Sequence, residues 1–275
     1  MKKIHLATFL VLTGAGFYSQ SARATTLTYS AGDLLMGFRD TAATANVFVL
    51  DIGQASLYTK DNGSTIVIGT YGTTLNANFT DGFYTGNTAW GVASIAVTGD
   101  PTNTLYAGAP EEPNGDKGDI NNAPVDPTGS GNAQNTAGSK IAAAGAFAAT
   151  SAAGNDGGSA VGTNGAWEST AGSPNSTSNW AYSMTNGGAP FGGYFSNGFE
   201  GDINNDGANG GTILDFWKLL PSGGTETYEG SFTISSTGLI TYQTAGTVPE
   251  PSTWTALAGG AGLLGLLRRR RAVAV

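Results

Sequence analysis

Between residues 27 and 108, apolar side chains come in short runs separated by residues that favour turns. The longest runs cover residues 34–38, 46–52, 64–70 and 90–98, and shorter ones cover 27–29 and 103–108. They are rich in Val, Ile, Phe, Tyr and Trp, which suit a pleated surface, and Gly, Asn, Asp and Pro lie between them. Strands at such spacing predict an antiparallel sandwich.

A second strand-like region covers residues 191–246. Phe232 and Ile234 alternate with polar neighbours, residues 236–238 form a turn, and residues 239–242 return, which predicts a hairpin. Residues 213–220 fit both a helical stripe and a strand. Aromatic residues in this run and Pro221 after it favour the strand.

The segment between these regions, residues 107–190, has a different character. It is rich in Pro, Gly, Asp, Asn and Ser, which predicts long loops. Its one helix candidate is the alanine-rich stretch 139–152. We therefore expect a β-rich extracytoplasmic domain over residues 25–246 with a loop-rich insertion at 107–190, flanked by segments 1–24 and 247–275.

Composition agrees with an all-β, mainly antiparallel, sandwich-like fold with long Gly, Asn and Ser loops, one short alanine-rich helix and a C-terminal transmembrane helix. The 275 residues include 43 Gly, and only 12% are charged. Gly, Ser, Thr and Asn are poorer helix formers than Ala, Glu or Lys.

The first 24 residues have the pattern of a secretory signal peptide. Lys2 and Lys3 precede a mostly apolar stretch, and Ala22 and Ala24 form a small-x-small cleavage site. We expect the Sec machinery to export the chain and signal peptidase to cut after Ala24. A retained membrane anchor is the alternative.

The predicted transmembrane helix spans residues 253–267. The 14 residues from Trp254 to Leu267 carry no charge. As a helix they measure about 21 Å, a minimal span for a hydrocarbon core of about 30 Å. Four arginines follow, which extend the span by snorkelling and mark the cytoplasmic side: Arg268, Arg269, Arg270 and Arg271. A buried core helix is the alternative, but it does not explain the arginine cluster.

The residues before this helix complete a tripartite pattern. They are Val248, Pro249, Glu250, Pro251 and Ser252. Together with the apolar helix and the arginines they resemble the PEP-CTERM sorting signal of Gram-negative bacteria. The resemblance implies recognition and tail removal by an exosortase, an integral-membrane cysteine protease. It also implies export across the inner membrane, transient anchoring, and delivery to the cell surface or the exopolysaccharide matrix.

The body is also similar to PEP-CTERM surface proteins found chiefly in Verrucomicrobia. The similarity rests on residues 32–39 and 214–242. It supports a β-rich fold and implies no mechanism.

Several kinds of chemistry are excluded by composition. The chain has no cysteine, and its one histidine is His5 in the predicted leader. Serine-histidine hydrolysis, cysteine catalysis and ordinary zinc sites are therefore not expected. Residues 25–246 hold five basic and 19 acidic residues, a net charge of −14, so nucleic-acid binding is not expected either.

One stretch resembles the start of a calcium-binding loop. Asp202, Asn204 and Asp206 are oxygen ligands at alternate positions, and Gly207 suits the turn. The twelfth position is Ile213 and not a carboxylate. A turn stabilised by Asp and Asn side chains is the alternative. No other cofactor is expected.

Two further groups of residues suit carbohydrate chemistry. Carboxylates available for glycoside hydrolysis occur without a recognisable motif: Glu111, Glu112, Glu168, Glu200 and Glu226. Aromatic residues in Gly- and Asn-rich segments suit either sugar stacking or a core position: Trp167, Trp180, Tyr182 and Tyr194.

The sequence therefore predicts an exported, exosortase-processed surface or exopolysaccharide-matrix protein with a structural or interaction role and no catalysis. A carbohydrate-binding module of the matrix is the first alternative. A secreted glycoside hydrolase-like enzyme is the second.

Overall fold

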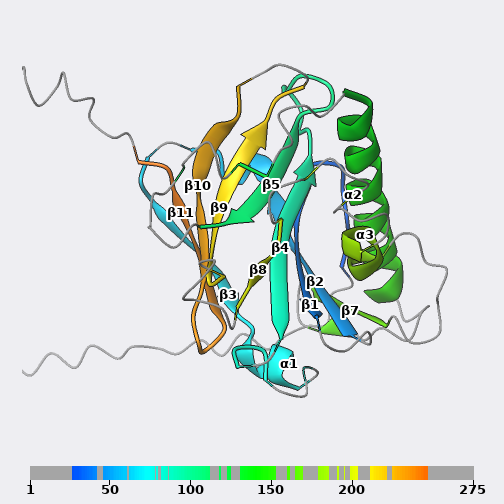
Figure 1. The fold of residues 1–275 in the computed structure, drawn as a ribbon, viewed down its shortest axis with the longest axis vertical. Coiled ribbons are helices and arrows are strands. Elements are labelled where there is room, and N and C mark those ends of the chain that lie inside the picture. Colours follow the sequence, from blue (N-terminus) through cyan, green and yellow to red (C-terminus); the bar gives the residue numbers. More distant parts are fainter. Residues whose placement is uncertain are drawn as a thin grey trace, which may run out of the picture.

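A computed structural model describes much of residues 27–246, and all of its strands belong to one antiparallel sheet (Figure 1). The described residues are 27–41, 46–60, 62–77, 79, 82–85, 87–111, 118, 123–124, 131–152, 160–161, 165–169, 179–185, 191, 195, 199–203, 211–221 and 225–246. The strand order is β3-β11-β10-β9-β5-β4-β1-β2-β7-β6, and the short β8 pairs with β4.

The strands are β1 (Asp33–Asp40), β2 (Asn46–Gln54), β3 (Thr65–Thr70), β4 (Thr88–Ile95), β5 (Leu105–Pro110), β6 (Ala160–Val161), β7 (Gly165–Ser169), β8 (Gly201–Asp202), β9 (Ile213–Leu219), β10 (Thr227–Ile234) and β11 (Leu239–Thr244). The helices are the 3-10 turn η1 (Ala55–Leu57), α1 (Gly72–Asn76), α2 (Gly131–Ala152) and α3 (Trp180–Thr185).

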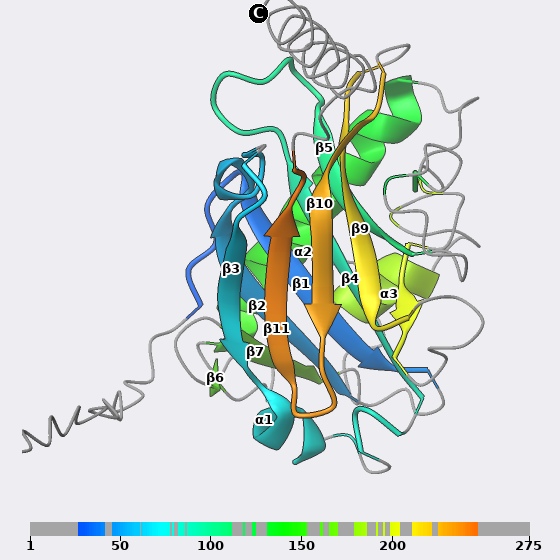
Figure 2. The same ribbon diagram turned by 90° about the vertical axis from the view of Figure 1, so that its left-hand side faces the viewer.

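The sheet curves so that its two ends face each other across an aromatic interior. Figure 2 shows β3, β11, β10 and β9 in front of β1, β2 and β7. Tyr58, which follows η1, packs on Phe232 of β10 and Tyr242 of β11 with ring centroids 5.5 and 5.1 Å apart. Leu34, Met36 and other buried residues from most strands complete this interior core.

The opposite face of the sheet carries a second core beneath the helices, which we call the helix-side core. Figure 1 shows α2 and α3 lying against the part of the sheet formed by β1, β2, β4 and β7. Helix α2 contributes Ala137, Ile141, Ala144 and Ala148, which follow the three- and four-residue spacing of one helical face. The small side chains let the helix lie close to the strands.

The predicted mainly β, antiparallel fold is confirmed, but the strands form one continuous curved sheet and not the two separate sheets of a sandwich. Curvature brings distant strands face to face without a break in the hydrogen-bonded order. The strand predicted over 213–220 is confirmed as β9, and the hairpin over 232–242 as β10 and β11.

Two predicted elements differ from the structure. The alanine-rich helix begins at Gly131, eight residues earlier than the predicted start at 139, because Gln134 and Ala137 already pack on the sheet. Residues 27–29 form no strand. They cross α2 instead, where the ring of Tyr29 lies directly over Gly145.

The segment 107–190 contributes to this sheet, since β7 pairs with β2 and α2 packs on β4 and β7. The predicted leader and the predicted transmembrane helix 253–267 lie outside the described residues. Within the described part of the chain, no helix combines the length and the apolar character needed to cross a bilayer.

Candidate functional site

The residues of the predicted calcium loop are only partly described. Asp202 ends β8, whose partner on β4 is Ala89, and Asn204 and Asp206 lie outside the described residues. Ile203 is buried in the interior core, and its N–H donates to the Thr88 carbonyl over 2.9 Å. Across the described ranges, no three acidic or histidine side chains form a group that could hold a metal ion. Calcium binding stays a prediction.

Among the predicted glycosidase carboxylates, Glu200 is engaged in a structural contact. Its carboxylate forms an ion pair with Arg39 of β1 at 2.6 Å and accepts a hydrogen bond from Trp180 Nε1 at 3.2 Å. Both interactions hold the segment 199–203 against the sheet. This structural role explains the presence of a carboxylate at position 200 without catalysis.

The other predicted carboxylates are dispersed. Glu111 is buried at the end of β5, Glu168 lies on β7, and Glu226 precedes β10. Glu112 lies outside the described residues. The structure therefore places no two of these carboxylates in a described cleft.

Trp180 does not belong to an exposed sugar-binding surface. Its side chain is 0% exposed, and its ring packs edge-on against Phe191 at 5.5 Å. It lies so close to Gly37 that a β-carbon at that position would overlap the ring. Trp167 is on β7, Tyr182 is on α3, and Tyr194 lies outside the described residues.

An acidic pair that the sequence did not indicate lies at the adjoining ends of β1 and β2. Asp33 and Asp51 are both buried and share a side-chain hydrogen bond. The Gly53 N–H also donates to Asp51 Oδ1 over 2.8 Å, and Gln54 Nε2 donates to Asp33. Burial raises the pKa of Asp51 to about 6, and Asp33 adds to the rise. The pair therefore binds a proton at mildly acid pH. The described residues around it form no substrate cleft.

A second pair of buried carboxylates lies on β5 and β9. Asp215 is 0% exposed, and its Oδ2 accepts a hydrogen bond from the Gly118 N–H over 2.9 Å. Ala109 is the β5 partner of Asp215, so Glu111 lies diagonally across on the same face. Burial, followed by the negative charge of Asp215, raises the pKa of the nearby Tyr228 to about 12. Through its hydrogen bond with the Gly118 N–H, Asp215 joins β9 to the chain segment at residue 118.

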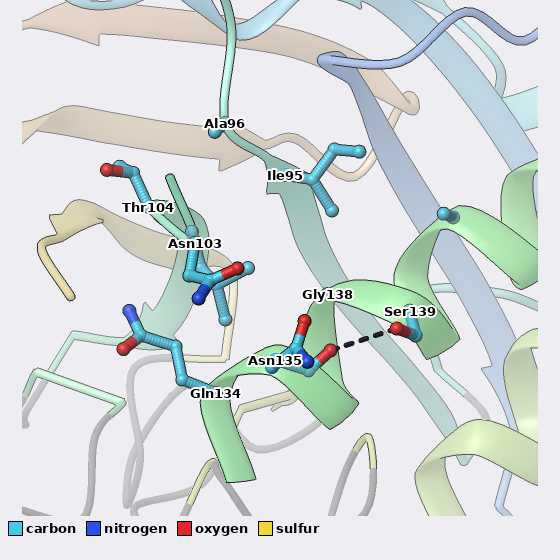
Figure 3. Close-up of a pocket in the computed structure, with 10 residues that line it drawn as sticks. Ile95, Ala96, Asn103, Thr104, Gln134, Asn135, Gly138 and Ser139 are labelled. Atoms are coloured by element: carbon cyan, nitrogen blue, oxygen red, sulfur yellow. Dashed lines mark hydrogen bonds between the residues drawn. The ribbon is translucent and has the colours of Figure 1, made fainter. Parts of the chain in front are cut away.

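A pocket of about 270 Å³ lies between α2 and the turn that joins β4 to β5 (Figure 3). Asn103 comes from the turn and Asn135 from the helix, and Figure 3 shows their amides on facing walls. Ser139 and the buried Thr104 add hydroxyl groups, and none of the ten lining residues is charged. Such a pocket can exchange hydrogen bonds with a small neutral ligand.

The strand side of the pocket is held by hydrogen bonds around a type II turn. The Thr104 N–H donates to the Pro101 carbonyl over 3.1 Å, and Asn103 has φ +70°, which this turn type requires and Asn tolerates. Asp100 at the base accepts hydrogen bonds from Lys218 Nζ at 2.7 Å and Tyr106 Oη at 2.8 Å. The wall is therefore fixed before any ligand arrives.

The charge of Asp100 favours the same arrangement. Burial acts to raise the pKa of this carboxyl, but hydrogen bonds from Lys218, Tyr106 and the Val97 N–H outweigh burial and lower it. Asp100 therefore stays ionised at neutral pH. The sequence predicts a turn at residues 99–101, but nothing in the sequence indicates that helix α2 lies opposite this turn.

The comparisons with known proteins concern the C-terminal segment. A family model described as the PEP-CTERM protein-sorting motif matches residues 247–271. No curated protein and no solved structure gave a match. The matched segment includes Pro249, Glu250 and Pro251, the apolar stretch and all four arginines. The chain therefore carries a PEP-CTERM sorting motif at residues 247–271, which marks it as an exported protein directed to an exosortase.

Proposed function

We propose that the body is a non-catalytic structural or interaction protein of the cell surface or exopolysaccharide matrix, released there when exosortase removes the C-terminal tail. The observation that carries the proposal is the sorting motif at residues 247–271, which directs the chain to exosortase. The body is the part of the chain left to act outside the cytoplasm.

The chemistry of the body supports a role without catalysis. Residues 25–246 contain neither cysteine nor histidine. The partly buried Glu200 and the buried Asp215 hold chain segments together through Arg39 and the Gly118 N–H. A net charge of −14 with few positive side chains keeps an extracellular protein soluble and away from phosphate backbones.

A carbohydrate-binding module remains the second candidate, and the neutral pocket between α2 and the β4–β5 turn favours it. Amide and hydroxyl groups there match the mixed donor and acceptor character of sugar hydroxyls. A glycoside hydrolase is less favoured, because its two catalytic carboxylates must lie about 5–10 Å apart in one cleft.

Intact-mass measurement in a host that carries the exosortase tests the sorting step. We expect the wild-type chain to lose both the leader and the tail and to leave the membrane fraction. Glu250→Ala and Pro251→Ala should keep the tail and remain in the membrane. Thr253→Ala, which lies within the matched segment but directly after Val248–Ser252, is the matched control and should be processed normally.

Two outcomes would contradict the proposal. Full-length chain found uncut in the soluble cytoplasmic fraction would refute export. Hydrolysis of a polysaccharide by the purified chain would refute the absence of catalysis.

A further inference from the structure

The pocket between α2 and the β4–β5 turn has the most defined chemistry, because hydrogen bonds of Thr104 and Gln134 hold its two walls. From this site we propose that the protein binds one neutral sugar residue in the pocket, held between the amides of Asn103 and Asn135. The assignment deepens the interaction role proposed above.

The polar groups of the pocket match a neutral ligand. A carboxamide presents a donor and an acceptor side by side, and each sugar hydroxyl can both donate and accept. Asn103 and Asn135 are exposed residues and are among the lining residues of the pocket. The hydroxyl of Ser139 already donates to the Asn135 carbonyl over 3.0 Å, which fixes that side chain beside them.

Not every polar lining residue is available to a ligand. The hydroxyl of Thr104 donates to the Pro101 carbonyl over 2.8 Å. The amide nitrogen of Gln134 is shared between the carbonyls of Leu219 and Leu220, at 3.3 and 3.2 Å. These bonds tie the turn and helix α2 to their surroundings, so Asn103 and Asn135 are the two amides that face the ligand.

The apolar part of the pocket suits the carbon face of a sugar ring. Ile95, Leu105 and Ala142 line it without a polar atom in their side chains. The ten lining residues offer no charge that could pair with a charged ligand, and the net charge of −14 also repels an anion.

The size of the pocket limits the ligand to about one ring. Its 270 Å³ lies just below the roughly 300–1,000 Å³ typical of sites for drug-sized ligands. With no aromatic ring in the lining and a ligand of this size, we expect a dissociation constant on the order of 1 mM.

Gly138 offers a substitution that separates binding from folding. A β-carbon there would lie 3.4 Å from Leu105 Cδ2 and 3.7 Å from Ile95 Cγ2, which is ordinary contact. Gly138→Ala therefore places a methyl group in the pocket without a clash. It also improves helix propensity in the interior of α2, so the melting temperature should stay the same or rise.

The binding experiment uses the full-length chain in detergent, so it does not depend on exosortase cleavage. Methyl glycosides of glucose, galactose and mannose are titrated and followed by side-chain amide signals in ¹H–¹⁵N NMR. We expect at least one glycoside to shift the signals of Asn103 and Asn135. Asn135→Ala and Asn103→Gly, which keeps the positive φ, should each weaken binding at least tenfold without lowering the melting temperature.

Two controls define the result. Gly138→Ala should abolish the shifts, and methyl glucuronide, which carries a negative charge, should bind at least tenfold more weakly than the best neutral glycoside. The proposal is wrong if no neutral glycoside shifts these signals, if the variants bind like wild type, or if the glucuronide binds equally well. A chain that binds the glycoside but is never processed would overturn the sorting proposal alone.

Discussion

One region of the sheet is buried on both faces, and another is exposed to solvent on its outer face. This difference explains why the strands of the two regions have different hydrophobic patterns. In the covered wall, formed by β5, β4, β1 and β2, both faces are buried: Leu34 and Met36 enter the interior core while Leu35 enters the helix-side core. In the bare wall, formed by β11 and β3, Ile240 and Tyr242 point inward while Leu239 and Gln243 are exposed.

The covered wall is near-continuously apolar, and the bare wall alternates. A strand buried on both faces needs apolar residues at every position, whereas a strand with one wet face needs them at every second position. Figure 2 shows the bare wall toward the viewer with α2 behind the sheet. The strands that the helices cover are therefore apolar at nearly every position, and the strands that they leave uncovered alternate.

The largest expected effect is the loss of Trp180 from the covered wall. Trp180→Ala should lower the free energy of unfolding by about 3–5 kcal/mol, because it empties the space between Gly37 and Phe191. Urea unfolding followed by circular dichroism measures this value. A loss below about 1 kcal/mol would show that α3 does not stabilise the wall.

The same substitution on each wall tests the comparison directly. Val49 is buried in the helix-side core, whereas Val67 on β3 is 66% exposed. Val49→Thr should cost about 1–3 kcal/mol because it buries a hydroxyl group. Val67→Thr should change stability by less than about 0.5 kcal/mol. Equal costs in paired thermal and urea denaturation would mean that an unrecognised contact covers β3.

The acidic pair makes the covered wall sensitive to pH. Because the pKa of Asp51 is raised to about 6 in the folded protein, the folded state binds more protons than the unfolded state between about pH 4 and pH 6. Stability should therefore fall as pH rises through this window.

Asp51→Asn should remove that slope and raise stability at pH 7 by about 1–2 kcal/mol, since the amide keeps a hydrogen-bonding group beside Asp33 without a charge. Unfolding midpoints at pH 4, 5, 6 and 7 for both proteins provide the measurement. An identical slope in the variant would assign the pH dependence to other groups.

A smaller effect is expected on the inner face of the bare wall. The Tyr242 hydroxyl lies 2.6 Å from the Tyr58 carbonyl and 2.7 Å from the Glu229 carbonyl. Tyr242→Phe should cost about 1 kcal/mol, because the interior offers little water to replace the donor. Thr241→Val, on the outer face of the same strand, is the control and should cost less. Chemical denaturation of the two variants, measured in parallel, shows which substitution lowers the free energy of unfolding more.

Much of the sheet was predictable because its patterns are local. The hairpin of β10 and β11 follows from alternation around residues 236–238, and β2 follows from the run 46–52. The start of α2 was not predictable, since Gly131 to Gly138 is poor in helix formers and is stabilised by packing on the sheet.

The candidate sites show the same division. Asn103 and Asn135 are 32 positions apart in the chain, and no local pattern relates them. They line one pocket because α2 packs against β4, and the turn that follows β4 carries Asn103. Trp180 was equally consistent with a surface or a core position, and its burial depends on the close approach that Gly37 permits.

The sequence alone determined the sorting motif of this protein and the β character of its body. A linear sorting motif is read as a continuous segment, and strand patterns depend on neighbours two residues apart. Only the tertiary structure decided which sheet face is covered, which acids share a proton and where the pocket lies. Each of these depends on contacts between residues distant in the chain, and such contacts are set by packing and not by local sequence.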